Sequence, residues 1–289
     1  MAFPMQRELY LPTVPTLTVS SQMHSGLSGP SLGSHGPSGP MAARLATGKQ
    51  APVAPSRFSA ASSSSAAVTV GSGPKTAAFS PYVLNGGTAL ALAGKDFCIV
   101  AGDTRMSAGY EIHTRNKPKT YRINDKCSIA MAGMQADATN LIKMLRFRIA
   151  MYERKMGKPM STQSLAQLVS TTLYRRRFFP IYAFVVIGGL DEDGVGSVYG
   201  YDAVGSFERS TCCVQGSGTS LLQPVLDNQF DFKNHSIKPD ELTLDESIDL
   251  VKDVFVSAGE RDIYTGDSVE MHIITADGVR VETFDLKRD

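Results

Sequence analysis

The order of strands and helices is the feature that most constrains the fold of this chain. Three apolar runs, TALALAG, DFCIVAGD and KCSIAMAG, come first and are typical of short strands. Two helical patterns follow, one over residues 136–156 and one capped by Ser161 or Thr162. Because strands do not alternate singly with helices, the pattern disfavours a doubly wound parallel sheet.

The second half of the chain shows the same grouping. IYAFVVIGGL and VGSVYGYD flank a turn signal at 191–194, and FERSTCCV is predicted to be one further strand. Thr243 and Glu246 form a capping-box pattern that opens a helix, and SVEMHIIT and VRVETFDL flank a turn at 276–278. This order predicts an α+β fold: a four-layer αββα sandwich of two antiparallel sheets between helix layers.

Residues 1–78 have a different composition from the rest. They are rich in Ser, Pro, Gly and Ala, and Glu8 is their single acidic residue. Such a segment buries too little apolar surface to offset the entropy of ordering, so we expect a disordered extension or pro-segment. The folded domain is predicted to span residues 79–289.

Charge and cysteine usage exclude several classes of function. The formal net charge is +1 and no apolar run is long enough to span a bilayer, so we expect neither nucleic-acid nor membrane binding. The four cysteines form no C-x-x-C pair and the five histidines are scattered, which predicts no metal site and no cofactor. Reduced thiols favour a protein of the cytoplasm and nucleus.

Polar residues gather at the ends of the predicted elements. Taken singly, each has an ordinary explanation: a buried ion pair, a helix N-cap or a turn glycine. No phosphate-binding loop or G-x-S-x-G elbow is present to suggest another site. The candidate residues are Asp103, Lys119, Gly133, Ser217, Asp262 and Thr265.

Four short motifs contain most of these residues. IVAGDTR, AMAGMQAD, GSG and RDIYTGD occur in this order, and together they resemble the proteasome beta subunits, which are N-terminal-nucleophile hydrolases. The resemblance covers residues 80–289 and includes longer stretches, such as RRRFFPIYAFVVIGGLDEDG, that are similar to one beta paralogue in particular. It implies the αββα fold and assembly with other alpha and beta subunits in a particle of stacked rings.

The resemblance also implies roles for the candidate residues. In active subunits an N-terminal threonine is the nucleophile, and its free α-amino group belongs to the base system. Asp103 and Lys119 match the aspartate and lysine that activate this threonine, and Gly133 matches the oxyanion-hole glycine. Ser217 and Asp262 match residues that support the threonine, and Thr265 stands where the family has a serine.

The spacing of these motifs places glycine at the nucleophile position. Active subunits have the aspartate 16 residues and the lysine 32 residues after the threonine, and both counts lead back to Gly87. Thr88 follows one residue later, so in a strand its side chain would point to the opposite face unless a bulge reset the register.

Two main hypotheses follow from this register. The first is a non-catalytic structural beta subunit of the 20S core particle, whose site lacks its attacking group. The alternative is an active threonine endopeptidase that uses Thr88 after removal of the pro-segment. A homomeric bacterial-type protease subunit would also need the nucleophile, and it would not explain the paralogue-specific stretches.

Overall fold

The computed structural model describes residues 80–236 and 241–288, so the predicted segment 1–78 lies outside the described residues. The described elements follow the order that the sequence predicts. They are β1 (Thr88–Ala93), β2 (Cys98–Asp103), β3 (Met106–Ala108), β4 (Glu111–Thr114), β5 (Thr120–Arg122), β6 (Cys127–Gly133), α1 (Gln135–Met156), α2 (Thr162–Tyr174), β7 (Ala183–Leu190), β8 (Gly196–Tyr201), β9 (Phe207–Ser210), β10 (Cys212–Gly216), α3 (Thr219–Gln229), α4 (Leu244–Gly259), β11 (Ser268–Thr275) and β12 (Gly278–Asp285).

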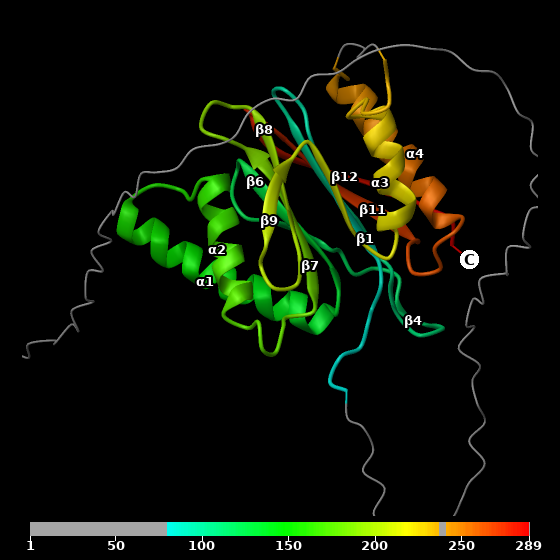
Figure 1. The fold of residues 1–289 in the computed structure, drawn as a ribbon, viewed down its shortest axis with the longest axis horizontal. Helices are drawn as coiled ribbons and strands as arrows, with labels where there is room; N and C mark the ends of the chain where they lie inside the picture. Colours follow the sequence, from blue (N-terminus) through cyan, green and yellow to red (C-terminus); the bar gives the residue numbers. More distant parts are fainter. Residues whose placement is uncertain (1–79, 237–240, 289) are drawn as a thin grey trace, which may run out of the picture. The chain divides into compact units, whose positions relative to one another are not determined.

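Two five-stranded antiparallel sheets form the centre of the domain. The first has the strand order β10-β1-β2-β11-β12, and the second has the order β5-β6-β7-β8-β9. A separate hairpin pairs β3 with β4. In Figure 1, α1 and α2 lie on one side of the paired sheets, and α3 and α4 lie on the other.

The alternation of side chains along each strand explains the layers. In β1, Leu90 and Leu92 belong to an apolar cluster shared with α3 and α4, whereas Ala89 and Ala91 belong to a cluster between the sheets. Small residues in the middle let the sheets approach closely: a β-carbon on Gly188 would lie 2.5 Å from a methyl carbon of Val100. A third cluster joins β6 and β7 to α1 and α2. The predicted four-layer sandwich is confirmed.

Local signals place several boundaries correctly. Ser161 is the N-cap of α2, and Thr243 and Glu246 form the capping box that opens α4. The turns predicted at 191–194 and 276–278 connect β7 to β8 and β11 to β12. No helix of the described residues is long and apolar enough to cross a membrane.

The prediction of one strand over FERSTCCV is wrong. The chain breaks at Thr211 into β9, which pairs with β8 in the second sheet, and β10, which pairs with β1 in the first. Only Thr211 separates the two strands, and FERSTCCV contains no Gly or Pro, so the switch from one sheet to the other has no turn signal in the sequence. Because of this switch, β10 ends beside the start of β1, next to the candidate site.

Candidate functional site

The polar candidates come together around the start of β1. Lys119 directly precedes β5, Asp103 ends β2, Gly133 ends β6, and Ser217 follows β10. Asp262 and Thr265 lie in the connection between α4 and β11. Hydrogen bonds link each of these residues to Asn85, Gly86, Gly87 or Thr88, or to another member of the group.

Asp103 and Lys119 form a fully buried ion pair. Lys119 Nζ lies 3.0 Å from Asp103 Oδ1, and the side chains are 1% and 0% exposed. The ammonium also donates to the carbonyl oxygens of Asp103, at 3.1 Å, and Arg105, at 2.5 Å. With these three contacts, all three hydrogens of the Lys119 ammonium have acceptors within the protein. Burial raises the pKa of Asp103, and the Lys119 charge and the Thr88 amide act in the opposite direction.

Gly87 is the residue that faces this pair. A β-carbon on Gly87 would lie 2.1 Å from Cε and 2.5 Å from Nζ of Lys119, and 2.8 Å from Asp103 Oδ1. Gly87 also has a φ of +86°, which side chains of L-residues rarely adopt. The position opposite the lysine thus holds only hydrogen, and the lysine stem fills the space where a side chain would begin.

Thr88 points to the other face of β1, toward the helix layer. It follows the same alternation as Leu90, which packs with α3 and α4. Its Oγ1 lies 2.7 Å from Thr265 Oγ1 and accepts a hydrogen bond of 3.0 Å from the Gly218 amide. Its backbone amide donates to Asp103 Oδ1 at 2.8 Å. Thr88 therefore touches the aspartate through its amide while its hydroxyl lies in a separate network.

Asp262 is the acceptor at the centre of that network. Its Oδ2 accepts hydrogen bonds from Ser217 Oγ, at 2.6 Å, and from Thr265 Oγ1, at 2.7 Å. Since the one hydroxyl hydrogen of Thr265 goes to Asp262, the Thr88 hydroxyl is the donor to Thr265. The Ser217 amide donates to the carbonyl of Gly87 at 3.0 Å. This network holds the first residues of β1 from the helix side.

Gly133 offers its backbone amide toward the residue before Gly87. The amide lies 3.5 Å from the Gly86 carbonyl oxygen, and the Asn85 amide donates to the Gly133 carbonyl at 3.2 Å. Gly133 has a φ of +102°, so glycine is required there. The N–H group that matches an oxyanion donor is therefore directed at a carbonyl of this same chain.

Sequence reasoning missed two residues of the site. Asp267 is 2% exposed and accepts from Arg105 Nε at 2.9 Å and from Arg115 Nη1. Burial alone would raise the pKa of Asp267, but its hydrogen bonds and ion pairs with the two arginines hold it below the usual range. Asn85 is buried and hydrogen-bonds with its side chain to β3 and to the start of α1. The sequence signal for Asp267 was its place at the end of the RDIYTGD motif. For Asn85 the sequence offered only the NGG triplet, which is typical of a turn.

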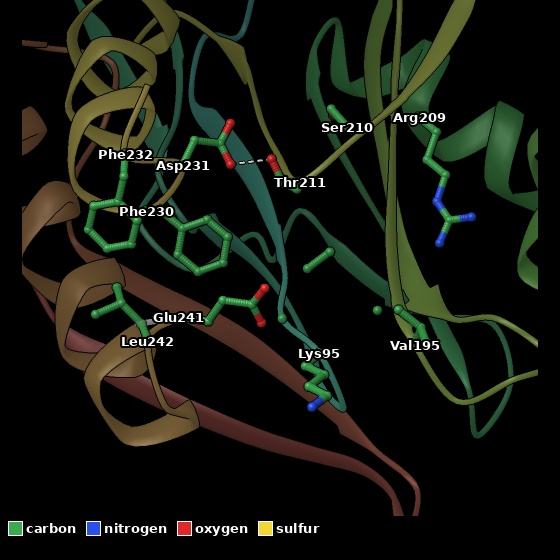
Figure 2. Close-up of a pocket in the computed structure, with 13 residues that line it drawn as sticks. Lys95, Val195, Arg209, Ser210, Thr211, Phe230, Asp231, Phe232, Glu241 and Leu242 are labelled. Carbon is green, nitrogen blue, oxygen red and sulfur yellow. Dashed lines mark hydrogen bonds between the residues drawn. The ribbon is translucent and has the colours of Figure 1, made fainter. Parts of the chain in front are cut away.

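A cavity lies away from this group. It has a volume of about 840 Å³, and its walls include Lys95, Arg209, Phe230 and Asp231. Figure 2 shows Asp231 hydrogen-bonded to Thr211 at its edge. Beside it, Cys212, Asp227 and Asp231 bring three possible metal ligands together. However, Lys233 Nζ lies 2.7 Å from Asp227 and 2.9 Å from Asp231, so an ammonium already pairs with both carboxylates.

The four-layer arrangement and the lysine–aspartate pair beside its first strand are those of the N-terminal-nucleophile hydrolase fold. The sequence model of the family described as "Proteasome subunit" matches residues 83–274, so the chain belongs to the proteasome subunit family. The predicted resemblance to one beta paralogue is also confirmed, and the chain is a beta subunit of the 20S core particle.

Its relatives span the eukaryotes. "Proteasome subunit beta type-1-B" of Carassius auratus is 48% identical over 219 residues, which cover 75% of this chain and 92% of the relative. "Proteasome subunit beta type-1" of Arabidopsis thaliana is 49% identical over 216 residues, covering 73% and 97%. "Probable proteasome subunit beta type-6" of Schizosaccharomyces pombe is 43% identical over 220 residues, covering 73% and 98%.

Proposed function

We propose that this beta subunit is itself non-catalytic and serves as a structural member of the 20S core particle that degrades proteins. The observation that carries the proposal is the direction of Gly87: a β-carbon there would point into the Lys119–Asp103 pair. A threonine nucleophile would place its hydroxyl oxygen beside Lys119, which would lower the pKa of that hydroxyl. Glycine supplies no oxygen, so the pair is left without a group to activate.

The alternative nucleophile, Thr88, has unsuitable surroundings in two respects. Its hydroxyl lies against Thr265 and Gly218, on the face of β1 opposite to Lys119. Its nitrogen is in a peptide bond with Gly87 and donates to Asp103, so it is not a free amine that could accept a proton. Cleavage between Gly87 and Thr88 would free the amine but would leave the hydroxyl on the wrong face.

In the particle, we propose that the subunit fills the sixth position of a seven-membered beta ring and contacts neighbouring alpha and beta subunits. Because Gly87 supplies no hydroxyl for self-cleavage, assembled particles should contain this chain with an N-terminus upstream of Gly87. We further propose that it works in the cytoplasm and nucleus, and binds neither nucleic acid nor membranes.

The decisive experiment uses a threonine-directed covalent inhibitor on assembled particles. Mass spectrometry should find the inhibitor on the active beta subunits of the same particles, which are the internal control, and none on this chain. N-terminal sequencing of this chain from the same sample gives the second measurement. An inhibitor adduct on Thr88, or a mature end at Thr88, would overturn the proposal and favour the active peptidase.

A further inference from the structure

The segment that precedes Gly87 lies along the candidate site and is bonded to both of its sides. The Asn85 amide donates to the Gly133 carbonyl at 3.2 Å, and the Asn85 carbonyl accepts from the Ser107 amide at 3.1 Å. Ser107 belongs to β3 and Gly133 ends β6. The backbone of Asn85 therefore bridges two elements, as an extended peptide does when it binds to exposed strand edges.

The Asn85 side chain completes this bridge. Its Nδ2 donates to the Ser107 carbonyl at 3.1 Å, and its Oδ1 accepts from the Gln135 amide at 2.9 Å. A carboxamide is suited to this place because it carries a donor and an acceptor on one short stem. Asn85 is only 6% exposed, and every one of its polar groups has a partner.

Tyr82 supplies a second point of attachment three residues earlier. Its hydroxyl donates to the Pro180 carbonyl at 2.9 Å, and its ring centroid lies 5.6 Å from that of Phe179 and 5.3 Å from that of Tyr182. The two residues between the attachments, Val83 and Leu84, are 50% and 54% exposed. The segment is thus held at its two ends and carries its apolar side chains outward.

The two glycines that follow fix the path of the chain. Gly86 has a φ of +66°, and a β-carbon on it would lie 2.5 Å from Cβ of Tyr264. Its carbonyl oxygen points at the Gly133 amide, at 3.5 Å. The amide that would stabilise the oxyanion of a substrate therefore faces a carbonyl of this segment instead.

We propose that β3 and the end of β6 form a peptide-binding cleft, that residues 81–86 are its built-in ligand with Asn85 as the main anchor, and that the cleft is closed to other peptides while this segment is in place. The inference rests on the proposed function, because the segment stays attached only if the chain is not cut next to Gly87. It adds that residues 81–86 block a site that already lacks a nucleophile.

The test compares assembled particles that carry Asn85→Ala in this chain with particles that carry Val83→Ala. Val83 lies in the same segment, is half exposed and is one of the two outward residues. Hydrogen exchange measured by mass spectrometry should show at least about 10-fold faster exchange of the Ser107 and Gln135 amides in Asn85→Ala, because their acceptors are lost or loosened. Val83→Ala should exchange like the wild type.

A second measurement asks whether the cleft becomes available. A photoreactive, N-acetylated tripeptide of apolar residues should cross-link to this chain near Ser107 or Gly133 in Asn85→Ala particles, and not in wild-type or Val83→Ala particles. If Asn85→Ala particles do not assemble, Asn85→Asp replaces it: it keeps the acceptor for the Gln135 amide but loses the donor to the Ser107 carbonyl, so faster exchange is expected at the Ser107 amide alone.

Each failure has its own signature. Equal exchange in Asn85→Ala and Val83→Ala, or equal peptide capture by the wild type, would overturn the built-in ligand. Neither result would put an inhibitor adduct on Thr88, so the proposed lack of catalysis would stand. Conversely, an adduct on Thr88 would overturn the lack of catalysis whatever the exchange rates were.

Discussion

The two faces of the chain at the start of β1 have similar polar groups and different consequences. On the inter-sheet face, Gly87 meets a buried lysine and aspartate but presents no oxygen to them. On the helix face, Thr88 presents a hydroxyl that donates its hydrogen to Thr265 and accepts a hydrogen bond from the Gly218 amide. The residue that faces the ion pair, Gly87, and the residue that carries a hydroxyl, Thr88, are neighbours in sequence and face opposite sides of the chain.

This comparison shows that register, rather than the presence of residue types, decides what the site can do. Alternation along a strand reverses the direction of a side chain with each residue. The inter-sheet face keeps its ion pair because the buried charges depend on each other, and the helix face keeps its hydroxyls because they fix the strand. Both faces are therefore explained by stability alone, and each can be tested on that basis.

The largest effect is expected on the inter-sheet face from Lys119→Met. Met fills a similar volume, but Asp103 would keep a buried carboxylate without its cation, which should lower the free energy of unfolding by about 3–5 kcal/mol. Urea denaturation of the full chain measures this loss. Lys233→Met is the control, because Lys233 is 56% exposed and its ion pairs should contribute at most about 1 kcal/mol. Equal losses in the two variants would contradict the structural role of the buried pair.

A smaller loss is expected from adding a side chain at Gly87. Gly87→Ala combines an unfavourable positive φ with a clash against the Lys119 stem, so we expect a loss of about 2–4 kcal/mol. Gly109→Ala is a matched control: Gly109 has a φ of +59° but nothing within 4 Å of the new carbon, so about 1–2 kcal/mol should be lost. The difference between the variants measures the clash.

The same clash predicts that Gly87→Thr alone does not create a peptidase. Its side chain would start inside the space that Lys119 occupies, so the lysine would have to move away from Asp103. Assembled particles with Gly87→Thr should show no inhibitor adduct on residue 87. An adduct there would mean that the Lys119 side chain moves aside at little cost and that the site lacks only the nucleophile at position 87.

On the helix face, Thr88→Val keeps the shape of the side chain and removes the hydroxyl. The Gly218 amide would lose its acceptor and Thr265 would lose a donor, so about 1–3 kcal/mol of stability should be lost. Thr171→Val is the control, since Thr171 is exposed on α2 and bonds only to its own helix; its change should stay within about 0.5 kcal/mol. If Thr88→Val lost as little stability as Thr171→Val, the hydrogen bonds of the Thr88 hydroxyl would not stabilise the helix face of β1.

The sequence alone was enough for the parts of the fold that depend on local signals. The capping box at Thr243, the N-cap Ser161 and the turn at 191–194 each depend on residues close together in the chain. The family motifs added the grouping of Asp103, Lys119 and the other polar residues, and the count back to Gly87 needed only their spacing.

What could not be predicted depends on pairing between distant residues. The break at Thr211 moves the chain from one sheet to the other, although no Gly or Pro marks a turn within FERSTCCV. Asn85 bonds to residues 22 and 50 positions away, and nothing in NGG distinguishes that arrangement from a turn. Both depend on which strand edges lie beside the segment, and this is decided by tertiary packing.

Acid should weaken a further contact near the lysine side of the site. Glu270 on β11 accepts from His272 and from Thr120, the neighbour of Lys119, and the hydrogen bond with His272 is the main cause of its lowered pKa. A lowered pKa in the folded state means that Glu270 stabilises the fold above its unfolded pKa of about 4.3, and that this contribution disappears as pH falls through the folded value.

Glu270→Gln tests this direction. The stability difference between wild type and variant should be largest near pH 7 and should shrink as the pH is lowered below about 4, in urea denaturation at several pH values. A difference that stays constant down to pH 3 would mean that the carboxylate charge of Glu270 is not the source of its contribution.

The smallest effect is expected at Ser107, which lies beside the built-in segment. Its hydroxyl is buried without a hydrogen-bond partner among the described residues, whereas its backbone holds Asn85. Ser107→Ala removes the hydroxyl and keeps the backbone, so stability should change by no more than about 0.5 kcal/mol. Ser128→Ala is the contrast, because the buried Ser128 hydroxyl lies 3.0 Å from His272 Nδ1 and its loss should cost about 1–2 kcal/mol. A large loss in Ser107→Ala would show that the side chain, and not only the backbone, holds the segment in the cleft.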